Sequence, residues 1–148
     1  MRNSIYLALF TALAWTSVQS DEPPEITVYK TPTCGCCGKW IDHLRDDGFS
    51  VTIRERSDLS AIKSANGVPR ELSSCHTAIV DGYVIEGHIP ADVIRRLLKE
   101  RPDVKGIAVP GMPAGSPGME VPGGVVQPYA VMTFDKDGNS EIYATRGE

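Results

Sequence analysis

Three cysteines lie within four consecutive residues of this chain, in the stretch TPTCGCCGKW. The residues just before it, 25–30 (EITVYK), alternate apolar and polar side chains and are rich in β-branched and aromatic types, which predicts a strand. From residue 36 onward the apolar residues recur at helical spacing as far as an Asp-Gly stop at 47–48. The sequence therefore places the three thiols where a strand leads into the N-terminus of a helix. These thiols belong to Cys34, Cys36 and Cys37.

Further strand and helix patterns follow the cysteine cluster. Residues 49–54 (FSVTIR) predict a second strand, and 58–65 predict a short helix whose first residue is a candidate N-cap. An Asp-Gly turn between 77–80 and 83–86 predicts a β-hairpin. Residues 90–100 begin with proline and predict a third helix. The order is βαβα followed by ββα, so we expect an α/β protein with a thioredoxin-like core.

The C-terminal part has a different composition. Residues 106–128 are so rich in Gly and Pro that we expect neither helix nor strand there, but a long structured loop or flap. A last β-hairpin is predicted over 129–144, with strands at 129–134 and 141–144. Its turn imitates the start of a calcium loop, but Ser140 replaces the glycine that such a loop requires, which favours a simple turn.

The first residues have the pattern of a secretory signal peptide over 1–20. Arg2 supplies the positive end, 5–15 form an apolar core, and small residues precede the expected cleavage site. The apolar core is too short to cross a bilayer, which disfavours an uncleaved anchor. We therefore expect one exported domain over 21–148, with no membrane-bound part after cleavage.

The charge of the chain excludes one class of function. Its formal net charge is −4, and its pI is near 5.4. A mildly acidic surface without a run of Lys or Arg repels phosphate backbones. We therefore expect no nucleic-acid partner.

Export to an oxidising compartment turns unprotected thiols into disulfides. Within the cluster only a Cys34–Cys37 bridge has comfortable geometry, because the other pairings join neighbours or close a ring around one residue. The same two cysteines have the C-x-x-C spacing of thiol-disulfide oxidoreductases, in which Cys34 would attack and Cys37 would resolve. Cys36 counts against this hypothesis, since a third thiol invites wrong bridges. A module stapled by permanent disulfides is a further alternative.

A fourth cysteine suggests metal binding instead. In thioredoxin-like folds the residue before the third strand packs against the C-x-x-C turn, and here that region contains Cys75. The sulfur atoms of Cys75 and of the three clustered cysteines, all soft ligands, would then converge on one point. Zinc favours two separated cysteine pairs, whereas Cu(I) accepts two or three thiolates and lets one sulfur bridge two ions. The expected metal ligands of this site, for more than one Cu(I) ion, are Cys34, Cys36, Cys37 and Cys75.

The histidines are weaker candidates. His88 lies just ahead of the proline that opens the third helix, where a neutral ring is favoured. It is either a metal ligand or a hydrogen-bonded structural residue. His76 follows Cys75 on a predicted strand, so we expect the two side chains to point to opposite faces unless the preceding turn intervenes, and we favour a structural role for His76 over a ligand role. His43 is expected to be solvated on the polar side of the first helix.

Two methionines and one tryptophan complete the candidates. Met112 and Met119, in the Gly/Pro-rich loop, carry soft thioethers that can approach Cu(I), or they fill space beneath the loop. Trp40 is expected to pack the first helix rather than to contact a cofactor.

Three motifs together resemble a known family. The combination of YKTPTCGCCGKW, SSCHTAIVDGYVIEGHIP and VPGMPAGSPGME closely resembles the CopG-type periplasmic copper-resistance proteins. The resemblance extends from about residue 26 to 129. It implies a thioredoxin-like fold and a multinuclear copper cluster on Cys34, Cys36, Cys37 and Cys75.

The leading hypothesis is therefore a periplasmic protein that stores or transfers copper, or converts Cu(I) and Cu(II). Its expected partners are copper ions and other periplasmic copper-handling proteins, and the chain is expected to be a monomer. Whether it is an enzyme stays open at this point.

Overall fold

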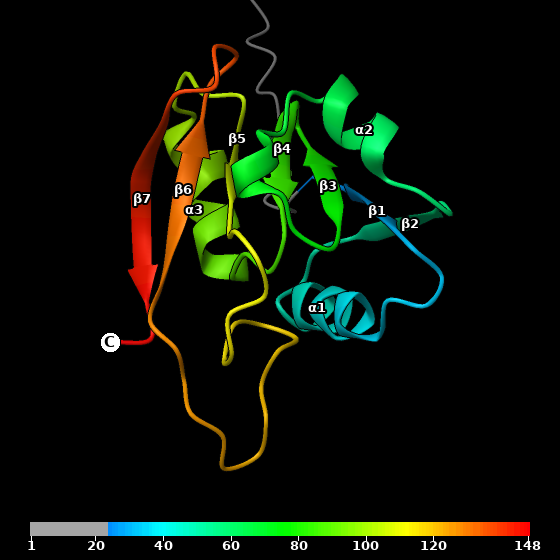
Figure 1. Cartoon of the computed structure of the whole chain (residues 1–148), viewed down its shortest axis with the longest axis vertical. Coiled ribbons are helices and arrows are strands. Elements are labelled where there is room, and N and C mark those ends of the chain that lie inside the picture. Colours follow the sequence, from blue (N-terminus) through cyan, green and yellow to red (C-terminus); the bar gives the residue numbers. More distant parts are fainter. Residues whose placement is uncertain (1–23) are drawn as a thin grey trace, which may run out of the picture.

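Seven strands form one mixed sheet in the computed structural model, which describes residues 24–148 (Figure 1). The strands are β1 Ile26–Lys30, β2 Val51–Glu55, β3 Thr77–Val80, β4 Tyr83–Glu86, β5 Gly106–Ala108, β6 Tyr129–Phe134 and β7 Ser140–Arg146. The helices are α1 Gly35–Asp46, α2 Ser60–Ala65 and α3 Ala91–Glu100, with a 3₁₀ turn η1 at Arg70–Leu72. The expected signal peptide over 1–20 lies outside the described residues.

The order across the sheet is β2-β1-β3-β4-β5-β6-β7. β1 runs parallel to β2 and antiparallel to β3, and β4 runs parallel to β5. The β3–β4 hairpin has the predicted bounds, because its two turn residues adopt the positive φ values that an Asp-Gly turn requires: 47° at Asp81 and 84° at Gly82. The predicted order of elements is observed from β1 to α3.

The main core lies between the sheet and the helices α1 and α3. Burying each large apolar side chain there contributes about 1.5–3 kcal/mol. The buried residues of this core include Ile26, Val28, Trp40, Ile41, Leu44, Ile85, Ile94, Leu97 and Ile107. A smaller cluster covers the opposite face and contains Leu72, Val84, Ala108 and Phe134. The fold thus fixes α1 against the sheet, with Trp40, Ile41 and Leu44 fully buried in the core.

The Gly/Pro-rich segment begins with a strand, so the prediction of no regular structure over 106–128 is wrong for β5. A Cβ atom at Gly106 would collide with the Val84 carbonyl oxygen and lie 2.9 Å from the ring of Phe134. Glycine therefore marks a close approach of two backbones here rather than a break. Residues 109–128, hereafter the flap, contain neither helix nor strand, as predicted.

Two short segments show how local hydrogen bonds set the ends of elements. α2 begins at Ser60, later than predicted, because the Asp58 carboxylate accepts bonds from the backbone N–H and the hydroxyl of Ser60. In the β6–β7 turn, the Asp135 carboxylate accepts from the backbone N–H groups of Asp137 and Asn139. The predicted simple turn is therefore observed. Within the described part of the chain, none of the helices has the length and hydrophobicity needed to cross a bilayer.

Candidate metal centre

The cysteine cluster lies at the N-terminus of α1, as the sequence predicts. Cys34 is the N-cap residue, and Cys36 and Cys37 belong to the first turn. The Cys37 side chain is fully buried, whereas Cys34 and Cys36 are partly exposed. Unpaired N–H groups give a helix N-terminus partial positive charge, which favours thiolates over thiols.

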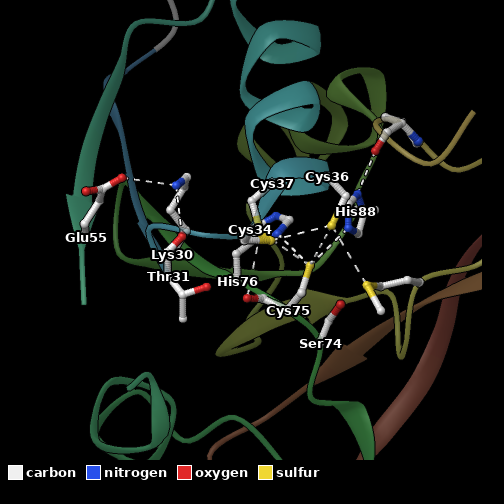
Figure 2. The surroundings of a disulfide bond; sticks show 12 residues. Lys30, Thr31, Cys34, Cys36, Cys37, Glu55, Ser74, Cys75, His76 and His88 are labelled. Carbon is white, nitrogen blue, oxygen red and sulfur yellow. Dashed lines mark hydrogen bonds and ion pairs between the residues drawn. A yellow bond between two sulfur atoms is a disulfide. The ribbon is translucent and has the colours of Figure 1, made fainter. Parts of the chain in front are cut away.

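The fold brings Cys75 to this cluster, although it is distant in the sequence. Its Sγ lies 3.6 Å from the Cys37 Sγ and 4.0 Å from the Cys36 Sγ. The Cys36 Sγ in turn lies 3.5 Å from the Cys34 Sγ. All four sulfur atoms lie within 4.8 Å of one another (Figure 2). The structure therefore brings together every cysteine that the sequence named as a metal ligand.

A disulfide joins Cys34 to Cys37, with their Cα atoms 5.4 Å apart. This is the pairing that geometry favoured within the cluster. Cys36 and Cys75 remain free thiols. A site with four thiolates is therefore available only after two electrons reduce this bridge.

A buried carboxylate holds the turn that carries Cys75. Glu86 is fully buried, and it accepts bonds from the Ser74 backbone N–H at 2.6 Å and from the Thr77 hydroxyl at 2.7 Å. The same carboxylate pairs with the Lys63 ammonium. Burial raises the pKa of Glu86, and Lys63 opposes that rise. Because Ser74 is bonded on one side of Cys75 and Thr77 on the other, Glu86 fixes the position of the cysteine.

His88 faces Cys75 from the loop after β4. Its Nε2 lies 3.1 Å from the Cys75 Sγ, and its Nδ1 lies 2.7 Å from the Pro117 carbonyl oxygen. A carbonyl only accepts, so the proton is on Nδ1 and the Nε2 lone pair points to the sulfur. Burial lowers the pKa of His88, which keeps the ring neutral. The sequence left open whether His88 is a metal ligand or a hydrogen-bonded structural residue. Its ring is hydrogen-bonded through Nδ1, and its Nε2 is still available as a ligand.

His76 lies on the same side as Cys75, so the expectation of opposite faces is wrong. Its Nδ1 is 3.2 Å from the Cys75 Sγ, and its ring packs on Trp40 with the centroids 4.3 Å apart. Alternation of side chains does not apply here, because both residues precede the first residue of β3 and lie in an irregular segment. Burial, and then the neighbouring His88, keep the pKa of His76 well below its usual range.

Cys75 favours its neutral form in the metal-free protein. Burial, followed by repulsion from Cys36, raises the pKa of the Cys75 thiol to about 12. A soft cation that enters the cluster replaces this proton, so metal binding releases it.

One residue of the flap, Gly118, lies against the backbone of the first turns of α1. Gly118 has a φ of 86°, and a Cβ atom on it would lie 2.8 Å from both the Cys36 carbonyl oxygen and the backbone nitrogen of Trp40. Nearby, the Met112 sulfur lies 4.0 Å from the Cys36 Sγ and is half-exposed. Met119 is half-buried and lines a cavity of about 370 Å³ beside Cys36. The flap therefore supplies one thioether at the cluster and a second one nearby.

Two residues of α1 have structural roles. The Trp40 indole N–H donates to the Ile89 carbonyl oxygen at 2.8 Å from a fully buried position, which confirms its predicted packing role. The expectation of a solvated His43 is wrong. Its Nε2 accepts a bond of 3.1 Å from the backbone N–H of Ala91, the first residue of α3. This contact satisfies one of the unpaired N–H groups at a helix start.

Comparison with known proteins identifies relatives. A family model described as "Protein of unknown function, DUF411" matches residues 72–119. The solved structure named "Copper resistance protein copG- Form 1" is 46% identical, with 86% of this chain and 100% of that chain covered and a TM-score of 0.80. "Copper resistance protein copG- Form 2" is also 46% identical, with 84% and 99% covered and a TM-score of 0.79. No curated protein sequence matches the chain.

Proposed function

This chain belongs to the CopG family of copper resistance proteins, and from this premise we propose that it binds Cu(I) in a multinuclear cysteine-thiolate site. The proposed ligands are Cys34, Cys36, Cys37 and Cys75. One observation carries the proposal: their four sulfur atoms, drawn from two distant segments, lie within 4.8 Å of one another. Thiolates are the ligands that Cu(I) prefers in proteins.

The adjacency of two ligands supports more than one ion. Successive side chains leave a helix about 100° apart, so Cys36 and Cys37 share one small ion poorly. With two or more copper ions this difficulty does not arise, because Cys36 and Cys37 can bind different ions and a bridging sulfur can link those ions. The site therefore suits several Cu(I) ions better than a single tetrahedral zinc ion.

Two further residues are proposed to complete the coordination. His88 presents its Nε2 lone pair at 3.1 Å from the Cys75 sulfur, while its other nitrogen donates to the Pro117 carbonyl. Metal-binding histidines have this arrangement, because the second bond fixes the tautomer and the ring orientation. Met112 offers a thioether 4.0 Å from the Cys36 sulfur. A mixed set of thiolate, imidazole and thioether ligands is well suited to copper.

The proposed setting is the periplasm. A signal peptide over 1–20 directs export and is then cleaved. The domain over 21–148 is proposed to contain a thioredoxin-like core, supported by the sheet order β2-β1-β3-β4 and by the cysteines at the start of α1. It acts as a monomer, free of the membrane after cleavage. It stores copper, transfers it to other periplasmic copper-handling proteins, or converts Cu(I) and Cu(II).

Anaerobic titration tests this proposal. Mature protein, residues 21–148, is reduced and freed of reductant, Cu(I) is added, and bound copper is counted per chain. The expected result is more than one copper per chain, with fewer in Cys36→Ser and Cys75→Ser. Met132→Leu, at a partly buried residue of β6 that packs against the smaller hydrophobic cluster, serves as a control in which the count stays at the wild-type value. No binding, or an unchanged count without Cys36 and Cys75, contradicts the proposal.

The Cys34–Cys37 disulfide supports a second candidate, thiol-disulfide exchange. In the reduced protein, the Cys34 thiolate attacks a substrate disulfide and releases one substrate thiolate. Cys37 then attacks the Cys34 sulfur, which releases the second substrate thiolate and restores the bridge. Reduction of insulin at substantial turnover, retained in Cys36→Ser and Cys75→Ser, would favour this function over copper binding.

A further inference from the structure

Two histidines contact the Cys75 sulfur, but only one has a partner for its second ring nitrogen. The His88 Nδ1 bonds to the Pro117 carbonyl oxygen. The His76 Nδ1 lies 3.2 Å from the Cys75 Sγ, and its Nε2 is buried with no hydrogen-bond partner among residues 24–148. The two rings are therefore not equivalent, although both approach the same sulfur (Figure 2).

The contact with Cys75 decides where the His76 proton lies, because Nε2 is unpartnered in either tautomer. The Nε2 of His88 accepts the single S–H hydrogen of Cys75, so a His76 proton on Nε2 would leave the His76 Nδ1 lone pair facing a sulfur that has no hydrogen to donate, at a cost of about 1–3 kcal/mol. A proton on Nδ1 instead reaches the Cys75 sulfur. The ring is therefore a donor to the sulfur, with its bare lone pair on the buried side.

The same argument separates the roles of the two rings in metal binding. A neutral imidazole that coordinates through Nδ1 carries its proton on Nε2. In His76 this proton would again lack an acceptor within the described residues. In His88 the second nitrogen already has its acceptor, the Pro117 carbonyl. The geometry therefore admits His88 as a ligand and disfavours His76.

We propose that His76 is a positioning residue of the copper site, whose Nδ1–H donates a hydrogen bond to the Cys75 sulfur without binding the metal. This inference rests on the proposed copper site. The bond orients the sulfur and withdraws electron density from it. Hydrogen bonds to a ligating sulfur tune the reduction potential of a metal site, and this one stabilises the reduced, more electron-rich state.

The surroundings of His76 make this bond effective. The ring is fully buried, and it is held between Trp40, with centroids 4.3 Å apart, and the edge of His88, with centroids 5.0 Å apart. Trp40 is itself fixed by its bond to the Ile89 carbonyl. A hydrogen bond is stronger in such a dry, rigid place than at the surface. His76 therefore acts on the electronic state of the site more than on its metal content.

The first experiment needs no copper. Reduced, metal-free mature protein with ¹⁵N-labelled histidine is studied by long-range ¹H–¹⁵N correlation, which shows the protonated nitrogen of each ring. The expected result is a proton on Nδ1 of His76 and on Nδ1 of His88. Cys75→Ala should shift the His76 Nδ1–H resonance. A His76 proton on Nε2 would overturn the inference.

The second experiment compares His76→Phe with His76→Asn in copper-loaded protein. Asparagine places an amide N–H at the same number of bonds from the backbone as Nδ1–H, so it retains the donor, whereas phenylalanine removes it. Both variants should bind as much copper as the wild type. At a fixed applied potential, the Cu(II)/Cu(I) ratio should rise about tenfold in His76→Phe, the scale of a hydrogen bond to a charged group, and stay near wild type in His76→Asn.

Each outcome of these experiments is decisive. Equal ratios in His76→Phe and wild type would overturn the inference, as would the loss of a copper ion in His76→Asn, which would make His76 a ligand. If the wild type binds no copper, the proposed function fails, and the tautomer measurement still decides whether the hydrogen bond exists. If His76→Phe does not fold, as judged by Trp40 emission, the same measurement on the wild type remains the test.

Discussion

The Nε2 atom of His88 lies 3.1 Å from the Cys75 sulfur, and its opposite nitrogen is held by the Pro117 carbonyl of the flap. This contact joins three distant segments: the turn before β3, the loop after β4 and the flap. A single ring thus couples the position of the flap to the sulfur cluster.

Replacing His88 should weaken copper binding. In His88→Gln we expect the Cu(I) affinity to fall at least tenfold, because one proposed ligand is lost and the Cys75 sulfur loses the contact with the His88 ring. Competition with a chelator of known Cu(I) affinity measures the change. His43→Gln is the matched control, since His43 bonds to the start of α3 instead. Equal affinities in His88→Gln and wild type would exclude His88 as a ligand.

The docking of the flap should depend on Gly118. In Gly118→Ala the new methyl group lies 2.8 Å from the Cys36 carbonyl oxygen and from the backbone nitrogen of Trp40. In addition, alanine is strained at the φ of 86°. We expect a loss of about 1–3 kcal/mol in the free energy of unfolding and faster proteolysis of the flap. Urea unfolding and limited proteolysis measure both effects.

A second flap glycine separates the two causes of that loss. Gly123 also has a positive φ, 68°, but no atom lies within 4 Å of a Cβ atom placed on it. Gly123→Ala should therefore show the backbone cost alone, about 1 kcal/mol. If the two variants behave alike, the close packing of Gly118 on α1 is not important for flap docking.

The buried Lys63–Glu86 pair should be essential for the Cys75 turn. In Glu86→Gln the Lys63 ammonium, whose side chain is 16% exposed, loses its counter-charge. We expect a destabilisation of about 3 kcal/mol, measured by urea unfolding. The double variant Lys63→Met, Glu86→Gln should recover part of this loss, because no unpaired buried charge remains. A double variant as unstable as the sum of both single variants would argue against the pairing.

The C-terminal hairpin should give the fold a dependence on alkaline pH. Burial, followed by its hydrogen bond to Glu100, raises the pKa of Tyr143 to about 12. The unfolded tyrosine has a pKa near 10, so the stabilising contribution is complete below pH 10 and is lost between about pH 10 and 12. The difference in unfolding free energy between wild type and Tyr143→Phe should shrink across this window. A difference that stays constant with pH contradicts the assignment.

The sequence predicted the elements whose signals are local. The β3–β4 hairpin has the expected bounds, because the Asp81-Gly82 pair demands a specific turn. Cys75 is at the expected place, because strand order alone brings its turn beside the start of α1. β5 was missed because Gly106 serves as a site of close backbone approach, which depends on Val84 of another strand.

The residues that the sequence misjudged are those whose partners lie far along the chain or in irregular segments. His43 bonds to Ala91, which no local pattern indicates. His76 was placed on the wrong face because a strand rule was applied before the strand begins. Glu86 was not recognised at all, although an acidic residue at the end of an otherwise apolar strand, YVIE, is a signal of a buried charge with a partner.

X-ray absorption at the copper edge of the reduced, Cu(I)-loaded mature protein tests the central claim most directly. The account predicts a first shell dominated by sulfur, together with a copper–copper distance that reports bridged ions. Cys36→Ser and Cys75→Ser should lose sulfur from this shell and weaken the copper–copper signal. A shell of nitrogen and oxygen without sulfur, or a spectrum unchanged by both substitutions, would contradict a multinuclear thiolate site.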